Sequence, residues 1–285
     1  MPSPAPACVR RHAARAMVVL FAWSLAACDM SLGNLAGRAT DEWTRTYPLT
    51  AGGEVRIANT NGRIDVQAID GNSVEVTAER IARAATDEGA RELLPRITIR
   101  EDIRPDRVSL ETERMSGIMI GANYEVRYHV RAPKSAAIDV TNTNGAVVVT
   151  GTAGKVAART TNGSVTTKDL TGPVEARTTN GSVTVDLASV KSERIALRTT
   201  NGSVTLRVPD DAKADVIATW TNGGFNVSDV KMDVSERSRR RFEGKINGGG
   251  APIELQTTNG GIRIRGRSDG PDKADTSEPP AGERR

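Results

Sequence analysis

The most regular feature of the chain is an alternation of apolar and polar residues on both sides of an Asn-Gly pair. The phrase Arg-Thr-Thr-Asn-Gly-Ser-Val-Thr is complete at residues 159–166, 177–184 and 198–205. Looser copies surround the Asn-Gly pairs that begin at Asn61, Asn144, Asn222 and Asn259. A period of two predicts half-buried β-strands before and after each pair.

Alignment of the copies on their asparagines shows that seven units share one register. Six residues before the asparagine stand Val55, Ile138, Val156, Val174, Ile195, Val216 and Ile253. The columns four residues before, three after and five after the asparagine are apolar too, except for Thr167. One face of every predicted strand is therefore expected to point into a common core.

Two folds can use such a unit. An Asn-Gly pair between alternating strands is a strong signal for a tight hairpin, so a meander of hairpins is one possibility. The other is a β-solenoid, in which Thr-Asn-Gly forms a corner and each strand pairs with its equivalent in the next coil. The asparagines at 144, 162, 180, 201 and 222 are 18, 18, 21 and 21 residues apart, which suits one coil per repeat. Identical corners allow asparagine and threonine side chains to stack and hydrogen-bond, which favours the solenoid.

The rest of the folded part differs from the repeats. Residues 43–133 predict a β-rich capping segment with strands at 73–80, 96–101, 107–113 and 123–131 and one short helix at 86–94. Residues 115–121 (MSGIMIG) suggest an apolar flap. Repeats occupy residues 134–265, within which Asn247 is expected in a loop because it lacks the apolar columns. The basic run at 233–243 also predicts a loop, and residues 266–285 a disordered tail.

The amino terminus resembles the export signal of a bacterial lipoprotein. Three arginines precede a short apolar run at residues 16–27, which is too short to span a bilayer. The run ends in Leu-Ala-Ala-Cys, similar to a lipobox, so residues 1–27 are expected to be removed and Cys28 to be lipidated. Residues 28–42 then form a tether. Asp29 resembles a signal for inner-membrane retention in enteric bacteria, a rule that differs between bacterial groups, so the membrane and the side it faces stay open.

Charge and composition exclude several classes of function. Removal of residues 1–27 takes away three arginines and no acids, leaving 36 Lys+Arg against 35 Asp+Glu, which gives no general electrostatic reason to bind nucleic acid. The processed chain would keep one histidine, His129, and no cysteine besides Cys28. No HExxH, GxSxG or phosphate-binding glycine loop is present, so we expect no metal, no cofactor and no nucleotide.

Two sets of residues are candidates for chemistry. Asp169 and Asp186 follow successive corners, as paired acids do in solenoid enzymes that cleave polysaccharides, although solvated loop acids are the simpler interpretation. Arg159, Arg177 and Arg198 stand three residues before successive asparagines, which predicts a column of like charges on one outer face. Such a column would gain from an anionic partner, such as phosphate or lipid A, unless acids such as Glu175 screen it.

Between residues 43 and 265 the chain resembles the bacterial DUF4097 family of β-strand-repeat proteins, whose members are often labelled as candidate adhesins. The resemblance rests on EVRIANTNGRIDV, TDEGARELL, NYEVRYHVRAP, the TTNGSV series and the final INGGG and TTNGGIRIRG segments. It implies an all-β, right-handed β-helix-like stack with no established enzyme activity. The adhesin label rests on fold analogy.

These observations lead to one main expectation and two alternatives. The chain is expected to be an exported, lipid-anchored, non-catalytic protein of the bacterial cell envelope that presents a β-solenoid for adhesion or for contacts with envelope proteins or glycans. The first alternative is a carbohydrate-active solenoid enzyme that uses Asp169 or Asp186. An assembly or envelope-stress factor that acts through protein partners is the second, and the sequence does not separate it from the first expectation.

Overall fold

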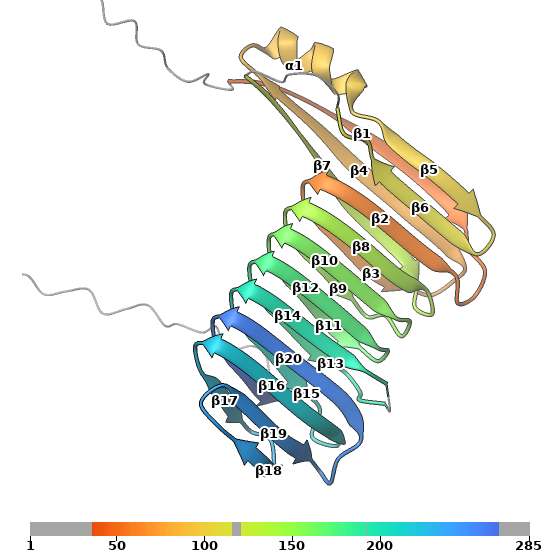
Figure 1. Ribbon diagram of the computed structural model, residues 1–285. Coiled ribbons are helices and arrows are strands. Elements are labelled where there is room, and N and C mark those ends of the chain that lie inside the picture. The colour runs from red at the N-terminus through yellow and green to blue at the C-terminus, as the bar shows by residue number, and fades with distance from the viewer. Residues whose placement is uncertain (1–35, 116–120, 192, 268–285) are drawn as a thin grey trace, which may run out of the picture. The chain divides into compact units, whose positions relative to one another are not determined.

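The computed structural model describes residues 36–115, 121–191 and 193–267, all of which belong to one compact unit, Asn34–Arg285. The proposed signal segment, Cys28, most of the apolar 115–121 segment and the tail from 268 onward lie outside the described residues. The described part is nearly all β-structure, arranged in two long sheets that face each other (Figure 1).

The first sheet has ten strands, and the second sheet has eleven. The order of strands in the first sheet is β1 (Gly37–Pro48), β4 (Ser73–Ala84), β7 (Ala122–Pro133), β3 (Ile64–Ile69), β9 (Val147–Thr150), β11 (Val165–Leu170), β13 (Val183–Leu187), β15 (Val204–Val208), β21 (Ile262–Gly266) and β17 (Phe225–Ser228). The order in the second sheet is β18 (Met232–Arg237), β19 (Arg241–Ile246), β16 (Ala214–Asn222), β20 (Ala251–Asn259), β14 (Ile195–Asn201), β12 (Val174–Asn180), β10 (Val156–Asn162), β8 (Ala137–Asn144), β2 (Glu54–Asn61), β6 (Arg107–Thr112) and β5 (Ile99–Arg104).

Each repeat is one solenoid coil and not a hairpin. The strand before the corner lies in the second sheet, the strand after it lies in the first, and equivalent strands of neighbouring coils pair in parallel. The corner asparagines are not among the non-glycine residues with positive φ in the described part, which are Asp169, Asp229 and Asn247. A type I′ hairpin needs positive φ at both central residues, so the corners cannot be hairpin turns.

Side chains of the corners join the coils to one another. After Asn61, Nδ2 of each corner asparagine donates to Oδ1 of the preceding one at 2.7–2.8 Å, through the row Asn61, Asn144, Asn162, Asn180, Asn201, Asn259 and Asn222. In four units a buried threonine stands two residues before the asparagine and donates to the glycine carbonyl of the neighbouring corner, as Thr178 Oγ1 does to Gly163 at 2.8 Å. The expected stacking is therefore confirmed for asparagine, while threonine bonds to the backbone and not to another threonine.

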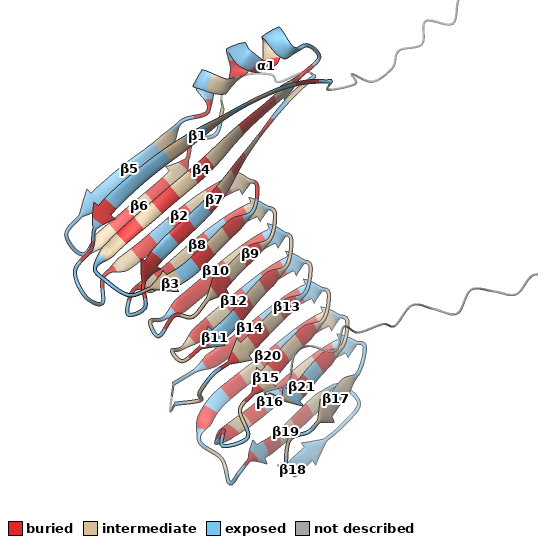
Figure 2. Cartoon of the chain, turned by 180° about the vertical axis from the view of Figure 1, so that it is seen from behind, coloured by how far each residue is buried: buried red, intermediate tan, exposed pale blue. Residues whose placement is uncertain are grey.

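The predicted inward columns form the core between the two sheets. All fourteen residues in the two columns six and four positions before the asparagine are buried, which gives the alternating stripes in Figure 2. In the columns three and five positions after the asparagine, only Phe225 and Val227 are half-buried, because their strand β17 lies at the end of the first sheet. Each fully buried valine, leucine or isoleucine contributes roughly 1.5–3 kcal/mol to folding, so the columns are the main source of stability.

The coils do not stack in the order of the chain. Strand β20 lies between β14 and β16, so the coil that contains Asn259 separates the coils that contain Asn201 and Asn222 (Figure 1). Strand β21 lies between β15 and β17 in the same way. The last repeat in the sequence is therefore an interior layer of the stack.

Antiparallel strands close the amino-terminal end of the stack. Strand β1 pairs along its whole length with β4, which pairs with β7. Because β1 begins at Gly37, the proposed tether of residues 28–42 extends too far, and alternation through Trp43 to Tyr47 continues a strand that starts earlier. The predicted helix is α1 (Asp87–Leu93), capped by Thr86, and a short η1 (Leu94–Arg96) follows. No helix in the described ranges is long and apolar enough to cross a membrane.

A hairpin closes the other end and corrects one expectation. The basic run at 233–243 predicts a loop, but β18 and β19 form an antiparallel hairpin that continues the second sheet beyond β16. The reason is that Phe242 and Ile246 alternate with polar residues and are buried. Phe242 stacks on Phe225 with ring centroids 4.2 Å apart, so aromatic rings cover the end of the core. Asn247 follows the hairpin and does not join the corner row, as the sequence predicts.

Candidate functional site: a charged face on the second sheet

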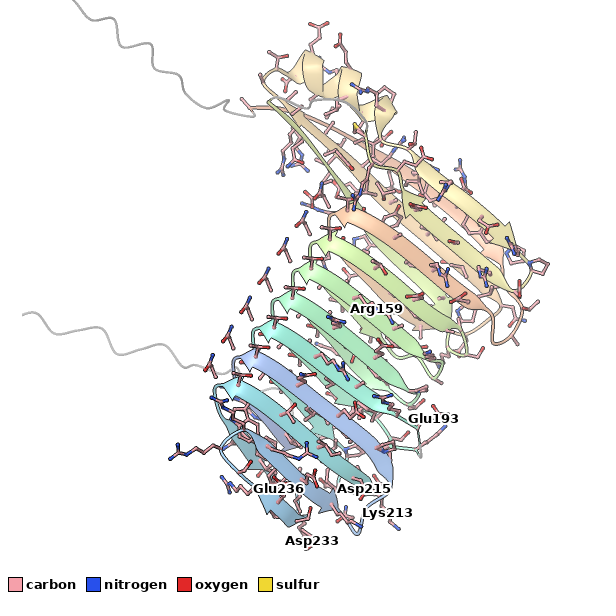
Figure 3. All side chains as sticks on the ribbon, in the orientation of Figure 1. Arg159, Glu193, Lys213, Asp215, Asp233 and Glu236 are labelled. Atoms are coloured by element: carbon pink, nitrogen blue, oxygen red, sulfur yellow. The ribbon has the colours of Figure 1, made fainter. Side chains whose placement is uncertain are left out.

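The predicted arginine column lies on the outer face of the second sheet. Arg159, Arg177 and Arg198 occupy equivalent positions on β10, β12 and β14, and each stands between two buried residues, so its side chain points outward (Figure 3 labels Arg159). The neighbouring coils place Thr141 and Gln256 in the same row. The column therefore consists of three arginines with an uncharged residue at each end.

A second outward column alternates acids with alanines. It stands two residues before the arginine column and runs, in stack order, through Asp139, Ala157, Glu175, Ala196 and Glu254. Long carboxylate side chains thus occur on every other coil, and a methyl group lies between them. This alternation controls both the charge and the relief of the face.

Acids neutralise the first arginine of the column. Arg159 lies with Nη1 at 3.3 Å from Oδ1 of Asp139 and with Nη2 at 2.9 Å from Oε1 of Glu175. All three side chains are partly exposed to solvent, so these pairs add little to stability and mainly fix the direction of the arginine.

The third arginine shares its acid with a fourth cation. Glu254 Oε2 lies 2.6 Å from Arg194 Nη2 and 3.4 Å from Arg198 Nη2. The hydrogen bond from Arg194, followed in importance by the weaker contact with Arg198, holds the pKa of Glu254 below its ordinary value. Glu254 is therefore ionised at neutral pH and compensates only one of the two arginines.

Arg177 differs from both neighbours. Its side chain is exposed and has no acid within ion-pair distance in the described ranges, since Glu175, the nearest acid along its strand, turns to Arg159. It lies between Arg159 and Arg198 in register. The middle arginine is thus the uncompensated charge of the column.

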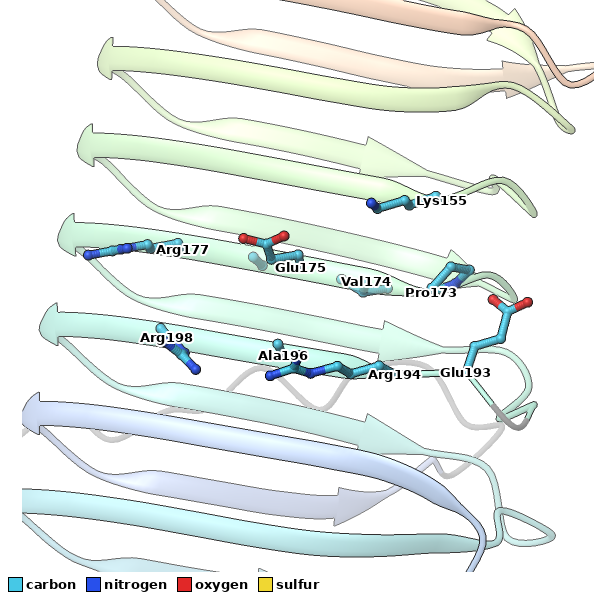
Figure 4. A pocket seen from close by; sticks show the side chains of 10 residues that line it. Lys155, Pro173, Val174, Glu175, Arg177, Glu193, Arg194, Ala196 and Arg198 are labelled. Atoms are coloured by element: carbon cyan, nitrogen blue, oxygen red, sulfur yellow. The ribbon is translucent and has the colours of Figure 1, made fainter.

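The alternation of long and short side chains produces a groove beside Arg177. Ala196 lies between Glu175 and Glu254 in the ladder, and its methyl group leaves a hollow of about 540 Å³. Its lining includes Lys155, Glu175, Arg177, Arg194, Ala196 and Arg198, and the side chains around it are shown in Figure 4. A volume of this size accommodates a small ligand.

The candidate catalytic acids come together but are occupied. Arg267, directly after β21, makes a hydrogen bond to Asp169 and places Nη1 at 3.5 Å from Oδ1 of Asp186. One guanidinium therefore bridges two successive coils. This arrangement explains the two acids as anchors for the end of the last strand, since both contact the guanidinium of Arg267.

The described ranges contain no group of three or more His, Cys, Asp and Glu side chains that could hold a metal ion. His129 lies on the outer face of β7, is 65% exposed, and has Nδ1 at 3.9 Å from Oδ2 of Asp65. It is a surface residue of the capping strands in the first sheet, whereas the groove lies on the second sheet.

Sequence reasoning found the arginine column and missed the groove. No local pattern marks Lys155, Arg194 and Ala196, because each is unremarkable within its own repeat. The column of acids and alanines carries the signal, which emerges when the residues five positions before each asparagine are read across coils. Arg194 could not be found in this way, because its role depends on Glu254, which is 60 residues away.

Comparison with known proteins agrees with this architecture. The family model described as Toastrack DUF4097 matches residues 97–265. The chain belongs to the Toastrack DUF4097 family. The match begins after the coil of Asn61, but β2 and β3 of that coil pair in register with β8 and β9, so the stack of this Toastrack protein extends beyond the matched residues.

Several solved structures are similar to the chain at low identity. A candidate cell adhesion protein from Clostridium sporogenes gives a TM-score of 0.41 at 9% identity, covering 80% of this chain and 100% of the other. A candidate adhesin from Bacteroides fragilis gives 0.39 at 11% identity, covering 80% and 97%. A candidate lipid-binding protein from Parabacteroides distasonis gives 0.26 at 9% identity, covering 83% and 98%. No curated protein matches the chain.

Proposed function

We propose that this chain is a lipid-anchored, non-catalytic protein of the bacterial cell envelope, which presents the outer face of its second sheet to other envelope components. The observation that carries the proposal is the fixed register of outward side chains. Parallel pairing, the asparagine row and the buried columns hold each outer residue at a repeating position. A surface preorganised in this way loses little conformational entropy when it binds a partner.

The anchor in the proposal rests on the sequence around Cys28. A lipidated cysteine would join the folded unit to a membrane through the residues that precede β1. Two or more acyl chains give durable attachment, since each buried methylene contributes about 0.8 kcal/mol. In the proposal the face-presenting unit and the anchor have separate roles, because the described core is built from residues of the β-structured unit.

The anchor is tested by the Cys28→Ala variant, with Cys8→Ala as its matched control. We expect Cys28→Ala to lose incorporation of labelled palmitate and acyl-dependent retention in the membrane fraction, while resistance of the β-structured unit to protease is unchanged. Cys8→Ala, which changes a residue of the proposed signal, should behave as wild type in both assays. Palmitate labelling that persists without Cys28 would contradict the anchor.

The non-catalytic part of the proposal is tested separately. Incubation of the chain with envelope polysaccharides and peptidoglycan should give no turnover. Turnover that disappears in Asp169→Asn or Asp186→Asn would instead support an enzyme and contradict the proposal.

A further inference from the structure

We infer that the groove beside Arg177 binds a phosphate or carboxylate group carried by a hydroxylated ligand, such as a sugar phosphate or a sugar acid. The inference deepens the proposed contact role of the second sheet and rests on it. Four cations line the groove, namely Lys155, Arg177, Arg194 and Arg198, against the acids Glu175 and Glu193. The lining therefore has an excess of positive charge, although the processed chain is almost neutral.

Arg177 and Arg198 supply the binding pair. They are equivalent residues of adjacent parallel strands, so their backbones are about 4.8 Å apart. The two side chains carry like charges on the same face, and an oxyanion that binds both reduces their mutual repulsion. Guanidinium groups bind carboxylate and phosphate oxygens with paired hydrogen bonds, which lysine cannot do. The unpaired state of Arg177 means that it can bind an anion without first giving up an acid.

The floor and the opposite side of the groove define the space for the rest of the ligand. Ala196 is only 8% exposed and contributes a methyl group, so the backbone of β14 is approached closely there. Arg194 lies on the other side of Ala196 from Arg198 (Figure 4) and is directed to Glu254. No aromatic side chain is among the lining residues, so a ligand would be held by charge and hydrogen bonds and not by stacking on a ring.

The acids on this face favour a discrete ligand over a membrane surface. Asp139, Glu175 and Glu254 interrupt the column at alternate coils and would face the headgroups of an anionic bilayer laid across the sheet. Their repulsion opposes binding of a continuous negative surface. In contrast, the single anionic group of a small ligand can reach the arginines within the groove, while the hydroxyl groups of that ligand donate to Glu175.

Equilibrium dialysis tests the inference with the full chain purified in a non-ionic detergent. The probe is radiolabelled inorganic phosphate, and the competitors are glucuronate and a soluble short-chain phosphatidylglycerol. We expect saturable binding, displacement by glucuronate, and weakening by added salt. Arg177→Gln should raise the dissociation constant at least about fivefold, because one charge-assisted contact is lost.

Two further variants make the result specific. Arg263→Gln is the matched control, since Arg263 is an exposed outward arginine of β21 on the opposite sheet. It should leave the dissociation constant unchanged. Glu175→Gln should lower the constant about twofold to threefold, because it removes an acid from the groove and releases Arg159 from one of its two partners.

The inference is overturned by absence of saturable binding, by equal effects of Arg177→Gln and Arg263→Gln, or by Arg177-dependent displacement by the short-chain lipid alone. The last result would assign the face to a lipid headgroup. None of these outcomes affects palmitate labelling at Cys28, so failure of the groove and failure of the anchor can be told apart.

Discussion

At the scale of single residues, the structure shows where the repeat departs from its own pattern. Thr167 on β11 is fully buried, and its hydroxyl oxygen has no hydrogen-bond partner in the described part of the chain. It lies in register between Val149 and Val185, which are also buried. A threonine thus occupies a position that neighbouring coils give to valine, a residue of the same shape without the polar group.

Thr167→Val should therefore stabilise the protein. Replacing a buried, unpaired hydroxyl by a methyl group removes a desolvation penalty of about 1–2 kcal/mol without opening a cavity. The free energy of unfolding measured in urea should rise by about 1 kcal/mol at an unchanged m-value. Thr184→Val, an outward position on the next strand, is the control and should change the free energy by no more than about 0.5 kcal/mol. A destabilised Thr167→Val protein would mean that the hydroxyl has a partner.

The corner glycines have two separate reasons to be glycine. Gly181 has φ +151°, and a Cβ atom there would lie 2.1 Å from the carbonyl oxygen of Gly163 in the neighbouring coil. Gly181→Ala should cost at least about 3 kcal/mol, because backbone strain and the clash add together. Gly224→Ala is the control, since a Cβ at Gly224 meets no atom within 4 Å. The thermal unfolding midpoints of the two variants are compared. Similar midpoints would show that neighbouring coils move apart easily.

At the scale of elements, the sequence predicted the strands of the repeats. It did not predict the segments whose structure depends on pairing with another strand. Strong alternation identified the strands of every coil, and the Thr86 cap identified α1. The hairpin β18–β19 was missed because a run of arginines outweighed two apolar residues, Phe242 and Ile246. The amino-terminal half of β1 was missed because β4 supplies its pairing from more than thirty positions away along the chain, a contact that no local pattern records.

The functional face follows the same rule. The arginine column lies within the repeated phrase and was predicted, whereas the groove requires Ala196 to stand between acids of two other coils. One of those coils, that of Glu254, becomes a neighbour only because β20 lies next to β14. The alternation of acids and alanines can be read from the repeats, but the groove could not be located from the sequence, because the stacking order that makes Glu254 a neighbour of Ala196 could not be predicted.

At the scale of the whole stack, the order of the last coils is the feature that the repeats leave undetermined. The units of Asn222 and Asn259 carry similar columns, so either could pair with the unit of Asn201. The structure places the Asn259 unit there. The difference is local: β16 is followed by β17 and the β18–β19 hairpin, and that hairpin pairs with β16 and occupies its outer edge. A coil with an occupied outer edge can only be the last layer.

Engineered disulfides test this order. Thr205 and Arg263 are neighbours on the outer face of the first sheet, and Asn226 lies one strand beyond Arg263. In a background with alanine at Cys8 and Cys28, Thr205→Cys with Arg263→Cys should form a disulfide on mild oxidation. Thr205→Cys with Asn226→Cys should not, since two strand spacings of about 10 Å exceed the reach of a disulfide. Stacking in chain order would reverse the two results, as read by non-reducing gel electrophoresis.

The interior position of the final coil also affects how the protein is made. A ribosome delivers the unit of Asn222 and its hairpin before residues 251–266, which form β20 and β21. During that interval β14 and β15 present open edges, and the unit of Asn222, which has matching columns, must finish one layer further away. The nascent chain therefore cannot complete its stack by adding layers in the order of synthesis. Its final arrangement is decided only after the last strand has left the ribosome.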